Sequence, residues 1–334
     1  MTTFSIIVPA FNSATYINRA IDSVINQTFE NFELIIVNDG STDETEQICR
    51  IYAEKDNRIR VITQNNTGHT GARNTGLLSS RGEYVVFLDS DDYLDEDVLY
   101  KCAANIEQHS PDIIVFSISV NDRNSRILLK NRIVDGLYCT KNNPYIEKRL
   151  IIDENGQFVF PKSLSGKVFK RNIVLDNQLN IPKTILIGED GACFVKTVLD
   201  SKTISVISDC CYNSIVRSES ISRSSDRNAV EKFICLMEYY RDFIPGDNAE
   251  LKKQADRFIV AQSYTAMQYV IRSDSDYCWI KNQYKILLTK DFVKSSISCA
   301  KFAFTRSGIR MIIKKFILKY GLISIMIFQN RKYR

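Results

Sequence analysis

The chain has 334 residues, of which 44% are hydrophobic and 25% are charged, a composition typical of a globular protein rather than a disordered one. The net charge of +5 is uneven: residues 292–334 contain ten Lys and Arg and no Asp or Glu, which leaves −5 for residues 1–291. A mildly acidic body with a basic tail argues against a nucleic-acid-binding core. No apolar run approaches the ~20 residues that a membrane-spanning helix needs.

The nine cysteines show no Cys-x-x-Cys spacing, and only two histidines accompany them, so a zinc site is not expected. From Met1 the chain runs directly into a strand-like segment, and we therefore expect no signal peptide. An odd cysteine count without a signal peptide predicts a reducing, cytoplasmic environment.

Residues 1–120 alternate between short apolar runs and amphipathic helical patterns. The runs rich in Ile, Val and aromatic residues are Phe4–Val8, Leu34–Val37, Arg60–Ile62, Tyr84–Leu88 and Ile113–Phe116. Between the first two runs, apolar residues recur at spacings of three and four. This alternation predicts an α/β fold with a Rossmann-like, mostly parallel sheet and helices on both faces, whose ligands bind beyond the carboxyl ends of the strands.

A cluster of three carboxylates, Asp89, Asp91 and Asp92, follows the apolar run that ends at Leu88. Like charges this close repel one another unless a cation lies among them, and hard oxygen ligands suit Mg²⁺ or Mn²⁺. The cluster therefore predicts a site for a metal ion and a phosphate-bearing substrate. The alternative is an ordinary polar loop in which Asp92 or Asp95 caps the next helix.

The loops after the first two predicted strands are also polar. Residues 9–15 contain no glycine, which argues against a Gly-x-Gly-x-x-Gly dinucleotide-binding turn and so against a dehydrogenase. In the second loop, Ser41 and Glu44 have the spacing of a capping box for the following helix.

The second half of the chain has a different character. Residues 121–225 are less regular, with a strand-like segment at Ile204–Ile207 and a Ser- and Arg-rich segment at Val216–Arg227, and residues 228–320 read as mainly helical. We therefore expect a boundary near residue 225, between a domain over residues 1–225 and a helical region over residues 226–334.

Four segments together resemble a known family. VPAFN (8–12), QTFENFELIIVNDGSTDET (27–45), GARNTGL (71–77) and GEYVVFLDSDD (82–92) are similar, in order and spacing, to the nucleotide-sugar-dependent glycosyltransferases of family 2, which have the GT-A fold. The resemblance covers residues 4–120 closely and about 160–225 more loosely. It implies an α/β GT-A catalytic domain over residues 1–225, with nucleotide-sugar binding in residues 1–120 and the acceptor side in residues 121–225, followed by a C-terminal helical extension.

The same resemblance implies the site residues. Asp39 would accept a hydrogen bond from the uracil ring, the Arg73 guanidinium would bind the diphosphate or the ribose, and Asp91 would hold Mn²⁺ or Mg²⁺. Asp89 would lie on the ribose side, Asp92 near the sugar and Phe11 against the base or ribose, while His69 has no assigned role. The nucleotide-sugar-binding residues are expected to be Pro9, Phe11, Asn12, Asp39, Gly71, Arg73, Asp89, Ser90 and Asp92.

The segment IGEDGACF (187–194) resembles the Glu-Asp pair that the family places about a hundred residues after its metal site. By this match Asp190 would be the general base, with Glu189 and Lys167 on the acceptor side. Without the match, acidic residues that favour a helix N-terminus would be the better explanation of Glu189 and Asp190, and a solvated lysine explains Lys167 equally well.

The implied reaction is an inverting transfer from a UDP-sugar to a hydroxyl of a glycan acceptor, which could be linked to a polyprenyl diphosphate, in surface-polysaccharide synthesis. Two alternatives stay open at this point, a sugar-phosphate nucleotidyltransferase and a non-catalytic sugar-nucleotide-binding module. The nucleotidyltransferase normally has a Gly-rich basic loop after its first strand, and residues 9–15 contain neither glycine nor Lys or Arg.

The basic tail, residues 305–334, has an amphipathic pattern. Its apolar residues share one predicted helical face, with Met311 and Leu318 outside it, and the members of that face are Ile309, Ile312, Ile313, Phe316, Ile317 and Tyr320. The pattern suits a helix that lies on an anionic membrane, or equally one that packs on the protein. The first possibility would make the protein cytoplasmic and peripheral to the inner face of the membrane.

Overall fold

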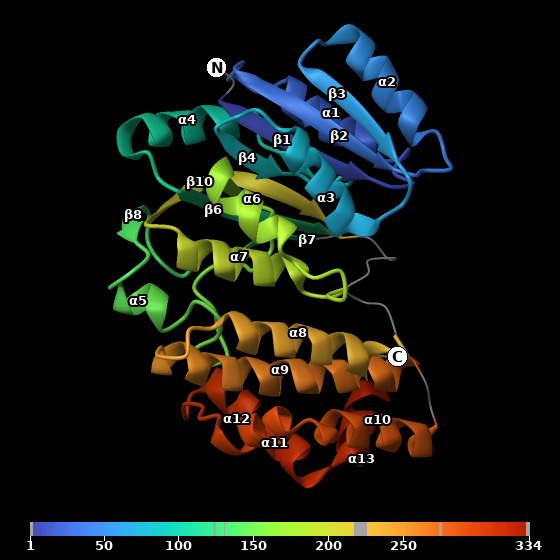
Figure 1. The fold of residues 1–334 in the computed structure, drawn as a ribbon, viewed down its shortest axis with the longest axis vertical. Coiled ribbons are helices and arrows are strands. Elements are labelled where there is room, and N and C mark those ends of the chain that lie inside the picture. Colours follow the sequence, from blue (N-terminus) through green and yellow to red (C-terminus); the bar gives the residue numbers. More distant parts are fainter. Residues whose placement is uncertain (1–2, 123–124, 130, 217–225, 274–275, 332–334) are drawn as a thin grey trace. The chain divides into compact units, whose positions relative to one another are not determined.

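The computed structural model describes residues 3–122, 125–129, 131–216, 226–273 and 276–331 (Figure 1). The chain forms two compact units. Unit 1 comprises Met1–Asn142, Phe160–Ile181 and Cys193–Arg217, and unit 2 comprises Asn143–Val159, Pro182–Ala192 and Ser218–Arg334. The sequence predicted one boundary at residue 225, whereas two internal segments group with the C-terminal helices.

Unit 1 contains a sheet and the helices that cover it. Its strands are β1 (Phe4–Ala10), β2 (Phe32–Asp39), β3 (Ile59–Gln64), β4 (Tyr84–Phe87), β5 (Tyr93–Leu94), β6 (Ile113–Asp122), β7 (Ser125–Leu129), β8 (Gly136–Cys139), β9 (Lys167–Lys170) and β10 (Thr203–Ile215). Its helices are α1 (Ile17–Ile25), α2 (Thr45–Lys55), α3 (Gly68–Ser79), α4 (Val98–His109) and α6 (Arg171–Leu179), and most of α7 (Glu189–Asp200) belongs to it as well. All five apolar runs of the first 120 residues form strands, as predicted.

The strands follow the order β3-β2-β1-β4-β9-β6-β10-β5. The first four are parallel to one another, whereas β9 lies antiparallel between β4 and β6, and only β6 and β10 form a further parallel pair. The parallel arrangement predicted from the sequence therefore holds for the N-terminal half, and the other half is mixed. The order reverses at β1, with β2 on one side and β4 on the other, and this is where open α/β sheets bind ligands.

Helix α3 lies unusually close to the sheet. A Cβ atom on Gly76 would come within 2.4 Å of Ile7 Cγ2 on β1 and 3.3 Å of Val37 Cγ2 on β2, so no side chain fits between the helix and the strands. Arg73 lies three residues earlier, and this places it on the same face of the helix. The close approach therefore carries a cationic side chain into the interior of unit 1.

Unit 2 is helical. It contains α5 (Pro144–Glu147), α8 (Ala229–Phe243), α9 (Ala249–Ser273), α10 (Tyr277–Thr289), α11 (Asp291–Cys299), α12 (Arg306–Tyr320) and α13 (Ile323–Arg331). The longest helix, α9, packs against α8 and against α10 to α13, and it buries Phe258, Ile259 and Met267 among them. The predicted helical character of residues 228–320 is confirmed, and most of the Ser- and Arg-rich segment Val216–Arg227 lies outside the described residues. Within the described ranges no helix combines the length and apolar character needed to cross a membrane.

Candidate functional site

The loops after β1 and β2 are joined by hydrogen bonds and form one side of the site. The backbone N–H of Asn12 donates to Ser41 Oγ at 3.0 Å, and Asn12 Oδ1 accepts from the backbone N–H of Thr42 at 2.8 Å. Asn12 has a φ of +47°, a left-handed conformation that asparagine adopts more readily than most residues. The predicted capping box is wrong, because the Ser41 hydroxyl serves Asn12 and the N-cap of α2, Glu44, makes no side-chain capping bond.

Asp39, the last residue of β2, is buried and held through one of its carboxylate oxygens. Oδ1 accepts hydrogen bonds from Gln64 Nε2 at 2.7 Å, from the Thr67 backbone N–H at 2.9 Å and from Thr67 Oγ1 at 3.2 Å. Gly71 makes room for this contact, since a Cβ there would lie 2.2 Å from Thr67 Oγ1. The arrangement fixes the Asp39 carboxylate in one orientation, with all of these bonds on a single oxygen.

The side chain of Arg73 on α3 is only 1% exposed, and its NH2 group lies 3.2 Å from Asp89 Oδ1. Its guanidinium carbon is also 5.8 Å from the centre of the Phe87 ring. Asp89 is contacted in addition by His69 Nε2, at 3.2 Å from Oδ1, and by the hydroxyl of Ser165, which donates to Oδ2 at 3.2 Å. This burial does not support the expectation that Arg73 binds phosphate oxygens directly; the guanidinium positions Asp89.

Burial and neighbouring charges shift the pKa values of two carboxylates of the cluster in opposite directions. Burial works to raise the pKa of Asp89, but the hydrogen bond from His69 and the charge of Arg73 hold it well below its usual range. Burial, followed by the charges of Asp89 and Asp91, raises the pKa of Asp92 to about 7. Asp89 is therefore ionised at neutral pH, whereas Asp92 carries a proton part of the time.

Asp92 is turned toward β10 rather than toward a helix. Its Oδ1 accepts from the backbone N–H of Ile215 at 2.8 Å, while Asp95 accepts from Asn213 Nδ2 at 2.7 Å. Neither carboxylate caps α4, so the alternative explanation of the cluster as capping residues is not supported. The nearby hydroxyl of Tyr212 accepts from the Asp89 backbone N–H at 3.1 Å, and burial, together with the Asp89 and Asp92 charges, raises its pKa well above the ordinary value.

Asp91 differs from its two neighbours because its side chain is partly exposed, while its backbone carbonyl accepts a hydrogen bond from Arg19. No group of three His, Cys, Asp or Glu side chains among the described residues could hold a metal ion by itself. A carboxylate at the rim of the site does suit a hard cation whose remaining ligands come from a substrate diphosphate and water, which is how Mg²⁺ is usually bound. The donor set thus fits a metal that arrives with its substrate.

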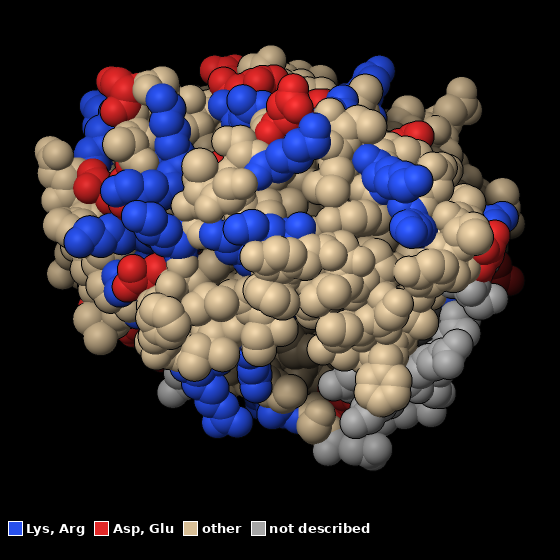
Figure 2. All heavy atoms as spheres, turned by 90° about the horizontal axis from the view of Figure 1, so that it is seen from below, with Lys and Arg blue, Asp and Glu red and all other residues tan. Residues whose placement is uncertain are grey.

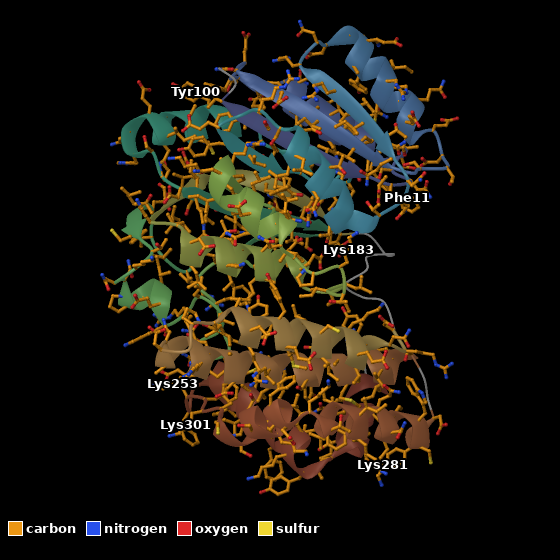
Figure 3. All side chains as sticks on the ribbon, viewed as in Figure 1. Phe11, Tyr100, Lys183, Lys253, Lys281 and Lys301 are labelled. Atoms are coloured by element: carbon orange, nitrogen blue, oxygen red, sulfur yellow. The ribbon has the colours of Figure 1, made fainter. Side chains whose placement is uncertain are left out.

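The remaining predicted nucleotide-side residues have different surroundings. Phe11 follows β1 with a side chain that is 49% exposed, at the edge where the parallel strands end (Figure 3). The Ser90 and Ser13 hydroxyls lie 2.7 Å apart and join the loops after β4 and β1. Pro9 is buried within β1, opposite Val37 of β2. Of these residues, only Phe11 offers a large apolar surface to a ligand.

Lys167 belongs to unit 1, whereas the acidic pair of Glu189 and Asp190 belongs to unit 2. Lys167 is fully buried in unit 1, where its ammonium donates to the carbonyls of Ser163 (2.6 Å) and Ser165 (3.3 Å) and lies 4.5 Å from the Phe194 ring centre. These contacts support the loop that carries Ser165. Glu189 and Asp190 are partly exposed in the first turn of α7, in the segment that belongs to unit 2.

Sequence reasoning missed three residues that the fold adds to the cluster: His69, Ser165 and Tyr212. Ser165 and Tyr212 are 76 and 123 residues from Asp89 in the chain, so no local pattern connects them to it. His69 lies four residues before Arg73, and because both residues are on α3 this spacing places them on the same face of the helix.

Comparison with known proteins gives consistent results. Residues 5–174 match the family described as glycosyl transferase family 2. The glycosyltransferase GlyA of Streptococcus pneumoniae is 32% identical over 220 residues, which are 66% of this chain and 31% of that protein. The poly(ribitol-phosphate) beta-N-acetylglucosaminyltransferase TarS of Staphylococcus aureus is 31% identical over 241 residues, 71% of this chain and 39% of TarS. The chain thus spans about a third of the length of these two relatives.

Two solved structures share the fold. Residues 1–349 of TarS, in complex with UDP-GlcNAc, superpose with a TM-score of 0.65 at 21% identity, covering 96% of this chain and 92% of that one. The mannosyltransferase PcManGT of Pyrobaculum calidifontis, in complex with GDP-Man and Mn²⁺, gives a TM-score of 0.52 at 16% identity, covering 94% and 86%. At these identities the likeness establishes the fold alone.

The buried pair of Arg73 and Asp89 generates a prediction about stability. Arg73→Met should lower the free energy of unfolding by about 2–3 kcal/mol, because it leaves a carboxylate that is largely shielded from water without its cation. In the double variant Arg73→Met/Asp89→Asn the loss should be smaller than the sum of the two single losses by at least ~1 kcal/mol. Urea unfolding followed by circular dichroism measures all three.

A matched control for this cycle is Arg50→Met. Arg50 also pairs with a carboxylate, Glu46, at 2.6 Å, but the pair is exposed on α2, and its loss should change stability by less than ~0.5 kcal/mol. Additive losses at Arg73 and Asp89 would show that the pair is not coupled as the structure indicates.

Proposed function

The chain belongs to glycosyltransferase family 2 and has the GT-A fold, and we propose that it transfers a hexose or N-acetylhexosamine from a UDP-sugar to a hydroxyl of a glycan acceptor with inversion at the anomeric carbon. Family membership makes it a glycosyltransferase rather than a nucleotidyltransferase or a non-catalytic binding module. Because the chain covers only about a third of GlyA and TarS, the donor and the acceptor are proposals.

The fixed orientation of the Asp39 carboxylate is the observation that supports a UDP-sugar as the donor. The described hydrogen bonds to this side chain all use Oδ1, from Gln64 and Thr67, and this leaves Oδ2 to accept the N3–H of a uracil ring. A carboxylate is an acceptor only, so it suits uracil, whose N3 is a donor, and not cytosine, whose N3 is an acceptor. The partly exposed ring of Phe11 after β1 would lie against the base or ribose.

Asp89 and Asp91 would bind the remainder of the nucleotide. Asp89, kept ionised and oriented by Arg73, would accept a ribose hydroxyl, and Asp91 would hold Mn²⁺ or Mg²⁺ between itself and the diphosphate. When bound, such an ion stabilises the negative charge that develops on the departing nucleoside diphosphate. Asp92 would lie near the sugar, where a carboxyl group that is partly protonated at neutral pH can donate as well as accept hydrogen bonds.

The proposed chemical step is a single in-line displacement. The acceptor oxygen forms a bond to the anomeric carbon while the bond from that carbon to the β-phosphate oxygen breaks, and UDP leaves with the bonding electrons. The acceptor's proton passes to Asp190, and Glu189 beside it would contact the acceptor. Support for Asp190 comes from the sequence match and from its partly exposed position in the first turn of α7.

The names of the relatives suggest an acceptor class. TarS acts, by its name, on poly(ribitol phosphate), and it was solved with UDP-GlcNAc. A polymeric or polyprenyl-diphosphate-linked glycan in surface-polysaccharide synthesis is the acceptor that we propose for this chain. A lipid-linked acceptor would bring the enzyme to the inner face of the cell membrane.

The uracil contact predicts the effect of Asp39→Asn. The amide keeps an oxygen for Thr67 but presents an N–H₂ donor to the uracil N3–H, so the dissociation constant for UDP should rise at least ~10-fold. The same amide can donate to cytosine N3, and the preference for UDP over CDP should therefore fall. Isothermal calorimetry measures both nucleotides. Asp97→Asn, an exposed partner of Lys101, is the control; an unchanged UDP affinity in Asp39→Asn would refute the contact.

Metal binding predicts a second calorimetric result. Mn²⁺ should tighten UDP binding to the unaltered chain, because Asp91 would hold the ion and its positive charge would attract the diphosphate. Asp91→Ala should abolish this enhancement while leaving the metal-free UDP affinity within about twofold, since the substitution removes only the metal contact. Asp97→Ala should retain the full enhancement. A Mn²⁺ effect that persists in Asp91→Ala would assign the metal to other residues.

Catalysis is tested by incubating the protein and Mn²⁺ with UDP-glucose, UDP-galactose, UDP-GlcNAc and UDP-GalNAc, and measuring released UDP and the anomer of the product. We expect turnover of one donor with inversion. Asp190→Asn should bind that donor normally and turn it over about 10²–10⁴-fold more slowly, the range for loss of a general base. Asp200→Asn, at the other end of α7, should behave like the unaltered chain. Normal turnover by Asp190→Asn would remove this residue from the mechanism.

A further inference from the structure

Helix α12 of unit 2 carries two apolar faces. Met311, Ile317 and Leu318 are buried against the rest of the unit, where α12 packs on α9, α11 and α13. Two of them, Met311 and Leu318, are the residues that the sequence pattern placed outside the apolar face. One set of apolar side chains therefore packs α12 into unit 2, and a second set of apolar side chains on the same helix remains exposed.

The second face is a row at spacings of four, three and four residues, which we call the outer row. Its members are Ile309, Ile313, Phe316 and Tyr320, whose exposed fractions are 43%, 49%, 53% and 57%. The Phe316 and Tyr320 rings lie 4.5 Å apart and so form a joint aromatic surface. Phe304, just before the helix, is 90% exposed, and Phe328 on α13 is 65% exposed. Single exposed apolar residues are common on proteins, but a row with aromatic neighbours on either side marks an interaction surface.

The charged residues of α12 itself are all cationic, whereas one exposed acidic residue, Glu154, lies near Phe304, because its carbonyl accepts a hydrogen bond from the Ala303 backbone N–H at 2.9 Å. Residues 292–334 include no Asp or Glu, and Arg306, Arg310 and Lys319 of α12 are exposed. The ammonium of Lys319 lies 5.5 Å from the centre of the Tyr320 ring, directly beside the outer row. Figure 2 looks onto the side of unit 2 where α11 to α13 lie and shows a broad area without Asp or Glu, with Lys and Arg along much of its border and Asp or Glu at a few places on it.

Other lysines of α12 serve the fold. Lys315 Nζ donates to the carbonyls of Ala300, at 2.6 Å, and Ser298, at 3.1 Å, near the C-terminus of α11. Lys314 Nζ lies 5.1 Å from the centre of the Tyr264 ring on α9. The helix therefore separates its cations: these two stabilise unit 2, and the exposed ones remain available to an external anion.

We propose that the outer row, with Phe304, Arg310 and Lys319, is a docking surface for an anionic lipid membrane, on which α12 lies with its apolar side chains among the acyl chains and its cations at the phosphate level. A helix with an apolar stripe whose own charged residues are all cations has the pattern of an interfacial helix. The surface does not match a second copy of the chain, because a two-fold contact through it would bring like charges together. The inference goes beyond the proposed reaction and does not depend on it.

Vesicle flotation with the full chain tests this surface. The protein should float with phosphatidylcholine vesicles that contain 30% phosphatidylglycerol and much less with pure phosphatidylcholine, and 0.5 M NaCl should weaken the binding. Ile313→Ser/Phe316→Ser should lower the vesicle partition coefficient at least ~10-fold, since two half-exposed apolar side chains no longer enter the membrane. Arg310→Gln/Lys319→Gln should remove most of the difference between the two vesicle types.

The matched control is Tyr100→Ser/Ile127→Ser, which removes two apolar side chains with 59% and 56% exposure from unit 1 and should float like the unaltered chain. Circular dichroism verifies that each variant is folded. Phe304→Ser is a further variant of the docking surface, and it should not affect folding because Phe304 is 90% exposed. Equal flotation of the unaltered chain and the outer-row variants would overturn the proposal. The proposal would also be overturned if neither the unaltered chain nor Ile313→Ser/Phe316→Ser floated and if sedimentation showed that the unaltered chain is a dimer and the variant a monomer. Flotation requires no donor, so its result is independent of whether UDP-sugars are substrates.

Discussion

The buried ion pair of Arg73 and Asp89 is the interaction on which the rest of the site depends. A guanidinium cannot give up its proton in a protein, so an arginine with 1% exposure requires a carboxylate beside it. Asp89 supplies that charge and is thereby kept ionised and fixed in direction. Its negative charge in turn helps to raise the pKa values of Asp92 and Tyr212. Burial is the larger cause of both shifts, and the hydrogen bond from His69 also lowers the pKa of Asp89, so the Arg73 cation acts together with these to set which neighbouring groups carry charge at neutral pH.

Two glycines of α3 make this placement possible. Gly76 lets the helix touch β1 and β2, which brings Arg73 into the interior, and Gly71 leaves room for Thr67 to hold Asp39. Asp39 and Asp89 are therefore positioned by the same helix. A site built on a packed helix and on strand ends holds its carboxylates more rigidly than one built on loops alone, as binding of a charged nucleotide requires.

Unit 2 shows how a helix can have both a structural and an external role. Met311, Ile317 and Leu318 hold α12 in the unit, so the outer row is presented by a helix that is already folded. A membrane that binds such a surface does not have to order the chain first, and less of the binding free energy is lost to conformational entropy than with a disordered basic tail.

The amino-acid sequence by itself determined the α/β architecture of residues 1–120, the places where the strands end and the residue types at those ends, because apolar runs and helical spacings report directly on which residues avoid water. It could not determine the partners of those residues. Ser165 and Tyr212 reach Asp89 from distant parts of the chain, the Ser41 hydroxyl bonds to Asn12 rather than to its own helix, and Lys167 is buried under the loop that it supports. In α12 the helical period identified apolar positions but not which of them the neighbouring helices would cover. Only the tertiary structure decided these points. Hydrogen bonds and burial depend on how close distant segments come in space, and the periodicity of residues along the chain does not specify that distance.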